Sequence, residues 1–185
     1  MQLQDIYIYP IKSLGGIRLE EANLEERGIQ FDRRWMLVDK EGVFLSQRKY
    51  SMMALVQTKL SDNGIEVFLK NHPDENIKIP FDPIGKEMIS VRIWDDEVTG
   101  QVEDQKINQW FSDILGLNCR LVFMPSSTER KVSSKYAAKN ESVSFADGMP
   151  YLLIGQASLD DLNSKLEHPV PMDRFRPNFV FSGGE

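Results

Sequence analysis

The sequence contains 185 residues, of which 41% are hydrophobic, so it is long enough for one large domain or two small ones with an ordinary core. Its 28 acidic residues outnumber the 22 basic ones and give a formal net charge of −6, which argues against a nucleic-acid partner or an anionic membrane surface. The single cysteine, Cys119, rules out an internal disulfide, and no apolar window reaches transmembrane length, so we expect a cytoplasmic protein with no membrane partner.

Short strands joined by tight turns dominate the first hundred residues. Residues 3–9 are rich in bulky and β-branched types and stop at Pro10, which predicts a strand followed by a turn. Turn-forming sequences then separate pairs of apolar runs, which predicts three hairpins. The paired runs are 34–39 with 43–46, 54–60 with 65–69, and 89–94 with 98–103. This density of short strands is typical of an antiparallel sandwich or barrel.

The pattern changes at Asp104, where apolar residues recur at helical spacing as far as Gly116 and predict a helix. The remaining predicted elements are a strand at 119–123, a long polar loop at 124–148, a buried strand at 151–155, a helix at 156–166 and a strand after Pro177. We therefore expect a mainly β protein with α+β character, divided near residues 116–118 into a barrel-like unit, 1–117, and a second unit, 118–185.

The last twelve residues, RFRPNFVFSGGE, combine a β-forming run with turn-forming glycines. A strand and a glycine turn normally lead into another element, and the second unit has few elements with which to cover a sheet. We therefore expect the sequence to be a fragment that stops within its second domain.

The turn after the first strand, YPIKSLGG, has the composition of an anion-binding site. Lys12 supplies a mobile positive charge, Ser13 supplies a hydroxyl donor, and Gly15 and Gly16 permit a close approach of the backbone to an oxyanion. The alternative is a plain turn with a solvated lysine, and these eight residues alone favour that alternative.

Two later segments place arginines beside predicted strands. In FDRRW, Arg33 and Arg34 alternate, so only one of them can enter a given pocket. In DRFRPN, Arg176 and Asn178 share a face and are suited to a phosphate and a heterocyclic edge. Each segment alone is equally compatible with a charged surface.

Other segments give weaker signals. The FADGMP turn can present Asp147 to a ligand, although a simple tight turn is the commoner role, and SQR offers Arg48 in the same way. Trp94 is expected in the core and His72 in a turn. No metal-ligand spacing, Walker loop, GxGxxG motif or serine-hydrolase elbow occurs, which argues against hydrolase, NTPase and Rossmann functions and against a metal held by this chain alone.

Taken in order, YPIKSLGG, DRRW, SQR, FADGMPYLLIGQASLDDLN and FRPNFVFSG resemble the MOSC family. More narrowly, the chain resembles members that join an N-terminal MOSC β-barrel domain to a MOSC domain, namely the mitochondrial amidoxime-reducing components and the bacterial YcbX-like proteins. The resemblance covers nearly the whole chain, and it implies that RFRPNFVFSGGE lies in the middle of a MOSC domain.

The resemblance implies a molybdenum cofactor, molybdopterin, whose phosphate and pterin are held by residues that match the family motifs. These residues are Lys12, Ser13, Arg33, Arg176 and Asn178, with Asp147 as a further lining residue. It also implies a small N-hydroxylated substrate, an electron-donor protein of the ferredoxin or cytochrome b5 kind, and a family-level association with pyridoxal phosphate. None of the six residues is expected to be catalytic or to bind the metal.

The sequence departs from the family in one respect. In members that reduce N-hydroxylated compounds, a cysteine beyond the SGG turn binds molybdenum, and Cys119 does not match it. We therefore expect the parent protein to be an oxidoreductase and the chain as written to be inactive. The alternative is a non-redox module that carries sulfur or the molybdenum cofactor.

Overall fold

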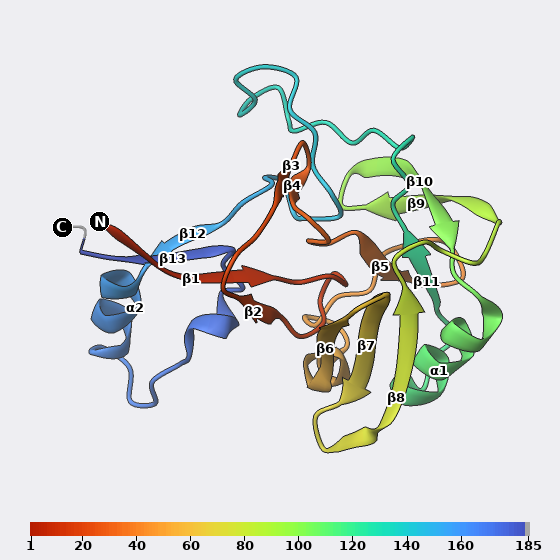
Figure 1. The fold of residues 1–185 in the computed structure, drawn as a ribbon, viewed down its shortest axis with the longest axis horizontal. Helices are drawn as coiled ribbons and strands as arrows, with labels where there is room; N and C mark the ends of the chain where they lie inside the picture. Colours follow the sequence, from red (N-terminus) through yellow and green to blue (C-terminus); the bar gives the residue numbers. More distant parts are fainter. Residues whose placement is uncertain (184–185) are drawn as a thin grey trace.

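The computed structural model describes residues 1–183, which form a mainly β structure with two α-helices (Figure 1). The mainly β class that the sequence predicts is confirmed. The division at residue 117 stays a prediction. No helix in the described part of the chain is long and apolar enough to cross a membrane.

One sheet brings together strands from the two ends of the sequence. Its order is β12 (Leu153–Gly155), β13 (Phe179–Ser182), β1 (Gln2–Ile8) and β2 (Ile17–Leu19). β1 and β13 run antiparallel, with Ile6 opposite Phe179, and they lie side by side in Figure 1. Helix α2 (Gln156–Asn163) lies beside this sheet. The turn that follows β1 is thus held next to the segment that leads into β13.

Two further sheets enclose the main hydrophobic core. The first has the order β5 (Trp35–Val38), β11 (Arg120–Phe123), β10 (Asp96–Val102) and β9 (Met88–Ile93), and the second has the order β6 (Val56–Ser61), β7 (Gly64–Leu69) and β8 (His72–Pro80). A short hairpin joins β3 (Leu24–Glu25) to β4 (Gly28–Ile29). The predicted hairpins β6–β7 and β9–β10 are confirmed.

Helix α1 (Gln105–Leu115) confirms the predicted helix at 104–116. Asp104 caps its first turn by accepting a hydrogen bond from the Lys106 amide, and Gly116 ends it with a left-handed backbone. Phe111 is fully buried on the inner face of α1 and joins Trp35 in the main core. The apolar residues at helical spacing therefore face the core, as the sequence pattern predicts.

Several expectations were wrong in detail. His72 begins β8 instead of lying in a turn, and Pro73 is tolerated because β8 is an edge strand. Residues 43–46 form only isolated bridges through Val43 and Phe44, so the first predicted hairpin lacks its second strand. Residues 54–55 belong to a 3₁₀ turn, η1 (Ser51–Leu55).

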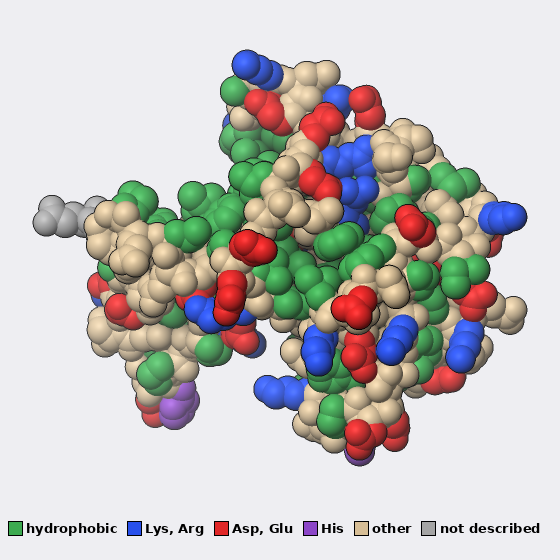
Figure 2. Space-filling view, viewed as in Figure 1, with side chains coloured by type: hydrophobic (Ala, Val, Ile, Leu, Met, Phe, Trp, Pro, Cys, Tyr) green, Lys and Arg blue, Asp and Glu red, His purple; other side chains and the backbone are tan. Residues whose placement is uncertain are grey.

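The predicted buried strand at 151–155 is shorter and more exposed than expected. β12 lies at a sheet edge, and its Leu153 is 60% exposed. Hydrophobic side chains are visible at the surface in this part of Figure 2. Helix α2 ends at Asn163, before the predicted residue 166. Gly184, which the sequence places in a turn, lies outside the described residues.

Candidate functional site

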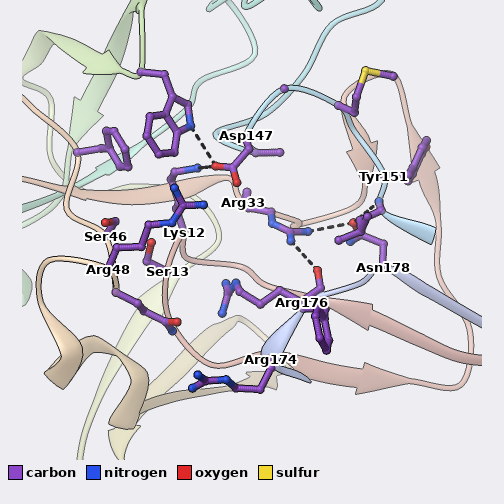
Figure 3. A pocket seen from close by; sticks show the side chains of 18 residues that line it. Lys12, Ser13, Arg33, Ser46, Arg48, Asp147, Tyr151, Arg174, Arg176 and Asn178 are labelled. Atoms are coloured by element: carbon purple, nitrogen blue, oxygen red, sulfur yellow. Dashed lines mark hydrogen bonds and ion pairs between the residues drawn. The ribbon is translucent and has the colours of Figure 1, made fainter. Parts of the chain in front are cut away.

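All six predicted site residues line one pocket, with a volume of about 590 Å³. They come from four segments of the chain: the turn after β1, the segment before β5, the segment before β12, and the segment between α2 and β13. Figure 3 shows Lys12, Arg33, Arg176 and Asn178 around this cavity, with Asp147 above Lys12. Three cationic side chains therefore meet in a protein whose net charge is negative.

Main-chain hydrogen bonds hold three of these segments together. The Arg33 amide donates to Tyr9 O at 2.9 Å, and the Lys12 amide donates to Trp35 O at 2.8 Å. The Phe145 amide in turn donates to Arg33 O at 2.9 Å. The turn after β1, the approach to β5 and the loop before β12 are thus fixed to one another close to the site.

Lys12 is 6% exposed and already has two acceptors. Its Nζ donates to Phe145 O at 2.8 Å and to Asp147 Oδ1 at 2.7 Å, and it lies 5.4 Å from the centre of the Phe44 ring. Burial lowers the pKa of Lys12 to about 8, although the Asp147 carboxylate opposes that shift. Lys12 is therefore largely protonated at neutral pH.

Asp147 has a solvent-exposed carboxylate that is nevertheless held in place. Its Oδ1 accepts hydrogen bonds from Lys12 and from the Trp94 indole, the latter at 3.1 Å. Desolvation raises the pKa of Asp147, but the Lys12 charge and these two hydrogen bonds outweigh it and lower the pKa below its usual range. An anionic carboxylate thus stands at the mouth of the cationic pocket.

Arg33 is fixed by several acceptors. Nη1 contacts Asp32 Oδ2 at 2.7 Å and Asn178 Oδ1 at 3.0 Å, while Nη2 donates to Arg176 O at 3.1 Å. Its guanidinium also lies 4.5 Å from the centre of the Tyr9 ring. Asp32 is 1% exposed, so its carboxylate both fixes Arg33 and accepts the Tyr9 amide at 2.8 Å.

Arg176 packs against the same aromatic ring. Its guanidinium lies 4.2 Å from the Tyr9 ring centre, and Nη1 donates to Leu14 O. Burial, followed by the nearby Arg33 charge, lowers the pKa of Arg176 to about 10, which leaves it protonated at neutral pH. Two like charges are therefore held near each other, an arrangement that an anion between them stabilises.

Three of the site residues have a left-handed backbone: Ser13 at φ 67°, Arg33 at φ 48° and Arg176 at φ 55°. This conformation is uncommon for residues other than glycine and costs of order 1 kcal/mol or more each. The main-chain bonds around the site hold them there. Backbone strain at several positions of one pocket is typical of a functional site.

Asn178 is 1% exposed and bonded within the protein. Its Oδ1 accepts from Arg33 Nη1 at 3.0 Å and from the Leu152 amide at 3.2 Å, and its Nδ2 donates to Tyr7 O at 3.1 Å. Both lone pairs of the amide oxygen are thus in use. The amide side chain orients Arg33 and ties β1 to the approach to β12.

The glycines of YPIKSLGG serve a different purpose from the one that the sequence suggested. The Gly15 amide donates to Val56 O at 2.8 Å, so it is not a free donor for an oxyanion. A Cβ on Gly16 would lie 2.4 Å from Tyr9 Cε1. Gly16 therefore leaves room for the ring on which the two arginines pack.

Comparison with known proteins agrees with these motifs: residues 1–118 match the MOSC N-terminal beta barrel domain. The chain belongs to the MOSC family. Residues 140–185 of this MOSC chain match the MOSC domain itself.

Curated relatives of two kinds are among the proteins that match the chain. The "Mitochondrial amidoxime-reducing component 1" of Mus musculus is 30% identical over 187 residues, covering 96% of this chain and 54% of the relative. The "Mitochondrial amidoxime reducing component 2" of Rattus norvegicus is 30% identical, covering 97% and 56%. The "Molybdenum cofactor sulfurase" of Arabidopsis thaliana is 29% identical, covering 99% and 25%. The chain thus spans about half the length of the first two relatives and a quarter of the third.

Trp94 is a pocket residue that the sequence analysis of this MOSC chain assigned to the core, and that assignment was wrong. It is 42% exposed and lies in the turn between β9 and β10 with φ 54°. The exposed indole packs edge-on against Phe44, with ring centres 4.7 Å apart. Its position directly before the acidic residues 95–97 was the available signal against a core position.

The sequence did not predict the role of Arg130. It is 4% exposed, and its guanidinium donates to the main-chain oxygens of Ser144, Ala146 and Asp147 and pairs with Asp96 at 2.7 Å. These bonds fix the backbone segment that supplies both acceptors of Lys12. Arg34, by contrast, points to Glu25 and Met124 O, so only Arg33 of the pair enters the pocket.

The donors of the pocket suit an anion and not a metal ion. Within residues 1–183 there is no group of three His, Cys, Asp or Glu side chains placed to hold a metal. Cys119 is 2% exposed and belongs to the main core with Phe111 and Leu121. Lysine and arginine donors beside exposed aromatic rings fit a phosphorylated heterocycle.

Proposed function

We propose that this chain holds molybdopterin in the pocket of Lys12, Arg33 and Arg176, and that the whole protein is a molybdenum-dependent oxidoreductase that reduces small N-hydroxylated compounds. The observation that carries the proposal is the meeting of these three cations, from three distant segments, in one cavity. An acidic protein needs such a local arrangement to bind an anion.

The pocket offers separate contacts for the two chemical parts of such a cofactor. The guanidinium groups of Arg33 and Arg176 and the Lys12 ammonium suit a phosphate, because each donates charge-assisted hydrogen bonds. Phe44 and Trp94 present aromatic faces on the Lys12 side of the cavity, which suit a planar heterocycle. The residues present therefore fit the organic part of the cofactor.

Each side chain has a distinct task in this proposal. Arg33 is preorganised by Asp32 and Asn178, so little rotamer freedom is lost when it binds an anion. Lys12 exchanges part of its contact with Asp147 for the ligand, and Ser13 lines the wall of the cavity beside it. The bound cofactor supplies the redox chemistry. The protein binds and orients the cofactor, and its fixed cationic side chains hold the phosphate of the cofactor in place.

Several finer assignments belong to the same proposal. The substrate class follows from the relatives named as amidoxime-reducing components. The proposal also includes an electron-donor protein of the ferredoxin or cytochrome b5 kind. It places the protein in the cytoplasm, which is a reducing location. Pyridoxal phosphate binding stays a prediction.

A second candidate function is a non-redox carrier of sulfur or of the cofactor. The relative named as a molybdenum cofactor sulfurase favours this second candidate. The chain aligns with 25% of that protein. Metal and activity analysis of the whole protein separates the two candidates. Reduction of an amidoxime by the molybdenum-loaded protein supports the oxidoreductase, whereas cofactor binding without turnover supports the carrier.

The double variant Lys12→Ala/Arg176→Ala tests the binding site. We expect it to lose co-purified molybdopterin, measured as the fluorescent oxidised pterin per mole of protein, while circular dichroism stays unchanged. The control is Lys59→Ala/Arg92→Ala, which removes two exposed cations that do not line the pocket. Equal pterin content in the two variants would show that Lys12 and Arg176 do not form the molybdopterin site.

A further inference from the structure

The ring of Tyr9 lies next to the cationic pocket without lining it. Tyr9 directly follows β1 and is 1% exposed. The guanidinium of Arg176 lies 4.2 Å from the ring centre, and that of Arg33 lies 4.5 Å from it. Both distances are within the range of cation–π attraction. One buried ring therefore contacts two of the three cations that meet in the pocket.

The ring of Tyr9, and not its hydroxyl, makes these contacts. Within residues 1–183 the buried hydroxyl has no hydrogen-bond partner. Burial raises the pKa of Tyr9 to about 12, although the charges of Arg176 and Arg33 oppose that shift, so the hydroxyl is uncharged at neutral pH. The two guanidinium groups are thus attracted to a neutral ring. A phenylalanine at this position would keep that attraction.

The two arginines depend on the ring to different degrees. Three hydrogen bonds fix Arg33 independently of the ring. The Arg176 side chain forms one within residues 1–183, from Nη1 to Leu14 O, and it takes part in no ion pair there. Figure 3 shows Arg176 extending into the cavity below Arg33, whose like charge repels it. The orientation of Arg176 therefore depends mainly on the Tyr9 ring.

Gly16 leaves the space that the ring occupies. A Cβ on Gly16 would lie 2.4 Å from Tyr9 Cε1 and 2.8 Å from Tyr9 Cδ1, which is too close for the ring to stay where it is. Gly16 does not have a left-handed backbone, so alanine adds a methyl group there without backbone strain. The change Gly16→Ala thus displaces the ring and leaves Tyr9 and both arginines in the sequence.

We propose that Tyr9 is a positioning residue of the anion site: its ring holds the Arg176 guanidinium beside Arg33, where both can contact a phosphate, and Gly16 keeps the space for that ring. This inference rests on the proposed function, because it assumes that an anion occupies the pocket. Tyr9 does not line the pocket, so it acts through Arg176 and not on the ligand. Without the ring, Arg176 has to be ordered when the anion binds, and the cost of that ordering lowers the affinity.

The test measures the dissociation constant of inorganic phosphate by titration calorimetry at neutral pH for Tyr9→Phe, Tyr9→Leu and Gly16→Ala. We expect Tyr9→Phe to bind phosphate within about twofold of the unchanged chain, because the ring remains. Tyr9→Leu and Gly16→Ala should bind it about fivefold or more weakly. Unchanged affinity in these two variants would overturn the proposal. A loss in Tyr9→Phe as large as that in Tyr9→Leu would also overturn it, because the hydroxyl would then be the group that matters.

A double-mutant cycle separates positioning from a merely structural role. In the Arg176→Ala background, Tyr9→Leu should lower the phosphate affinity by less than about twofold, because the guanidinium that the ring holds is gone and Arg33 keeps its own hydrogen bonds. A further loss of about fivefold in that background would show that the ring acts by stabilising the fold in general, and would overturn the proposal. If circular dichroism shows that Tyr9→Leu does not fold, the same cycle with Gly16→Ala decides.

The outcome for the proposed function is read separately. If Lys12→Ala/Arg176→Ala loses phosphate binding while Tyr9→Leu and Gly16→Ala bind as the unchanged chain does, the anion site stands and only the role of Tyr9 fails. If Lys12→Ala/Arg176→Ala binds phosphate as tightly as the control Lys59→Ala/Arg92→Ala, or if the unchanged chain does not bind phosphate, the anion site fails together with the role of Tyr9.

Discussion

Replacing Asn178 by alanine tests whether the pocket depends on this amide as a structural tie. The change removes hydrogen bonds to Arg33 Nη1, the Leu152 amide and Tyr7 O, all between 3.0 and 3.2 Å long. A hydrogen bond contributes about 1 kcal/mol between neutral groups and about 1.5 kcal/mol or more to a charged one. The expected loss in the free energy of unfolding is therefore about 3.5 kcal/mol, which lowers Tm by roughly 7–14 °C.

Urea denaturation followed by tryptophan fluorescence measures this loss as a shift of the midpoint at constant slope. The matched control is Asn71→Ala, because Asn71 is exposed in the turn between β7 and β8 and is expected to change stability by less than about 0.5 kcal/mol. A loss below about 1 kcal/mol for Asn178→Ala would refute the structural role. The amide would then be free to face a ligand directly, as the sequence first suggested.

The remaining predictions concern protonation and the loop that carries Asp147. Because burial lowers the pKa of Lys12 to about 8, its positive charge is lost above that pH, so phosphate affinity measured by calorimetry between pH 7.5 and 9.5 should fall as pH rises. Lys12→Ala should bind more weakly with no such fall, and a similar fall in that variant would exclude Lys12 as its origin. Arg130→Lys keeps the charge but loses the fork that reaches three main-chain oxygens, so we expect a loss of about 2–4 kcal/mol in unfolding free energy and faster proteolysis within residues 124–148. Unchanged proteolysis would show that Arg130 does not hold this segment.

Elements with strong local signals were predictable from the sequence. Asp104 and Gly116 bracket α1 because a side-chain cap and a left-handed glycine are local devices. The β6–β7 hairpin likewise follows from its turn residues. β8 was missed because His72 and Pro73 carry turn signals, and only its place at a sheet edge makes proline acceptable there.

The chemistry of the site was predictable only in part, because the sequence shows the charged residues but not which of them meet. Lys12, Arg33 and Arg176 stand in motifs whose charge is visible in the sequence, but no local rule states that their segments meet. Arg130 was not predictable because three of its partners are main-chain oxygens, which carry no sequence signal, and because the fourth, Asp96, is distant in the sequence. Trp94 was misplaced because large aromatic residues are usually buried, and its exposure depends on the tertiary position of one turn.

The pairing of β1 with β13 has a consequence for biosynthesis. About 170 residues separate the two strands, so at roughly 5–20 residues per second the ribosome needs about 10–35 s after making β1 before its partner exists. Throughout that interval β1 presents an open edge to other chains, which is an aggregation hazard in a crowded cell. Arg176 and Asn178 are also made long after Lys12 and Arg33, so under the proposed function a cofactor that arrives before their synthesis lacks the contacts that these two residues provide.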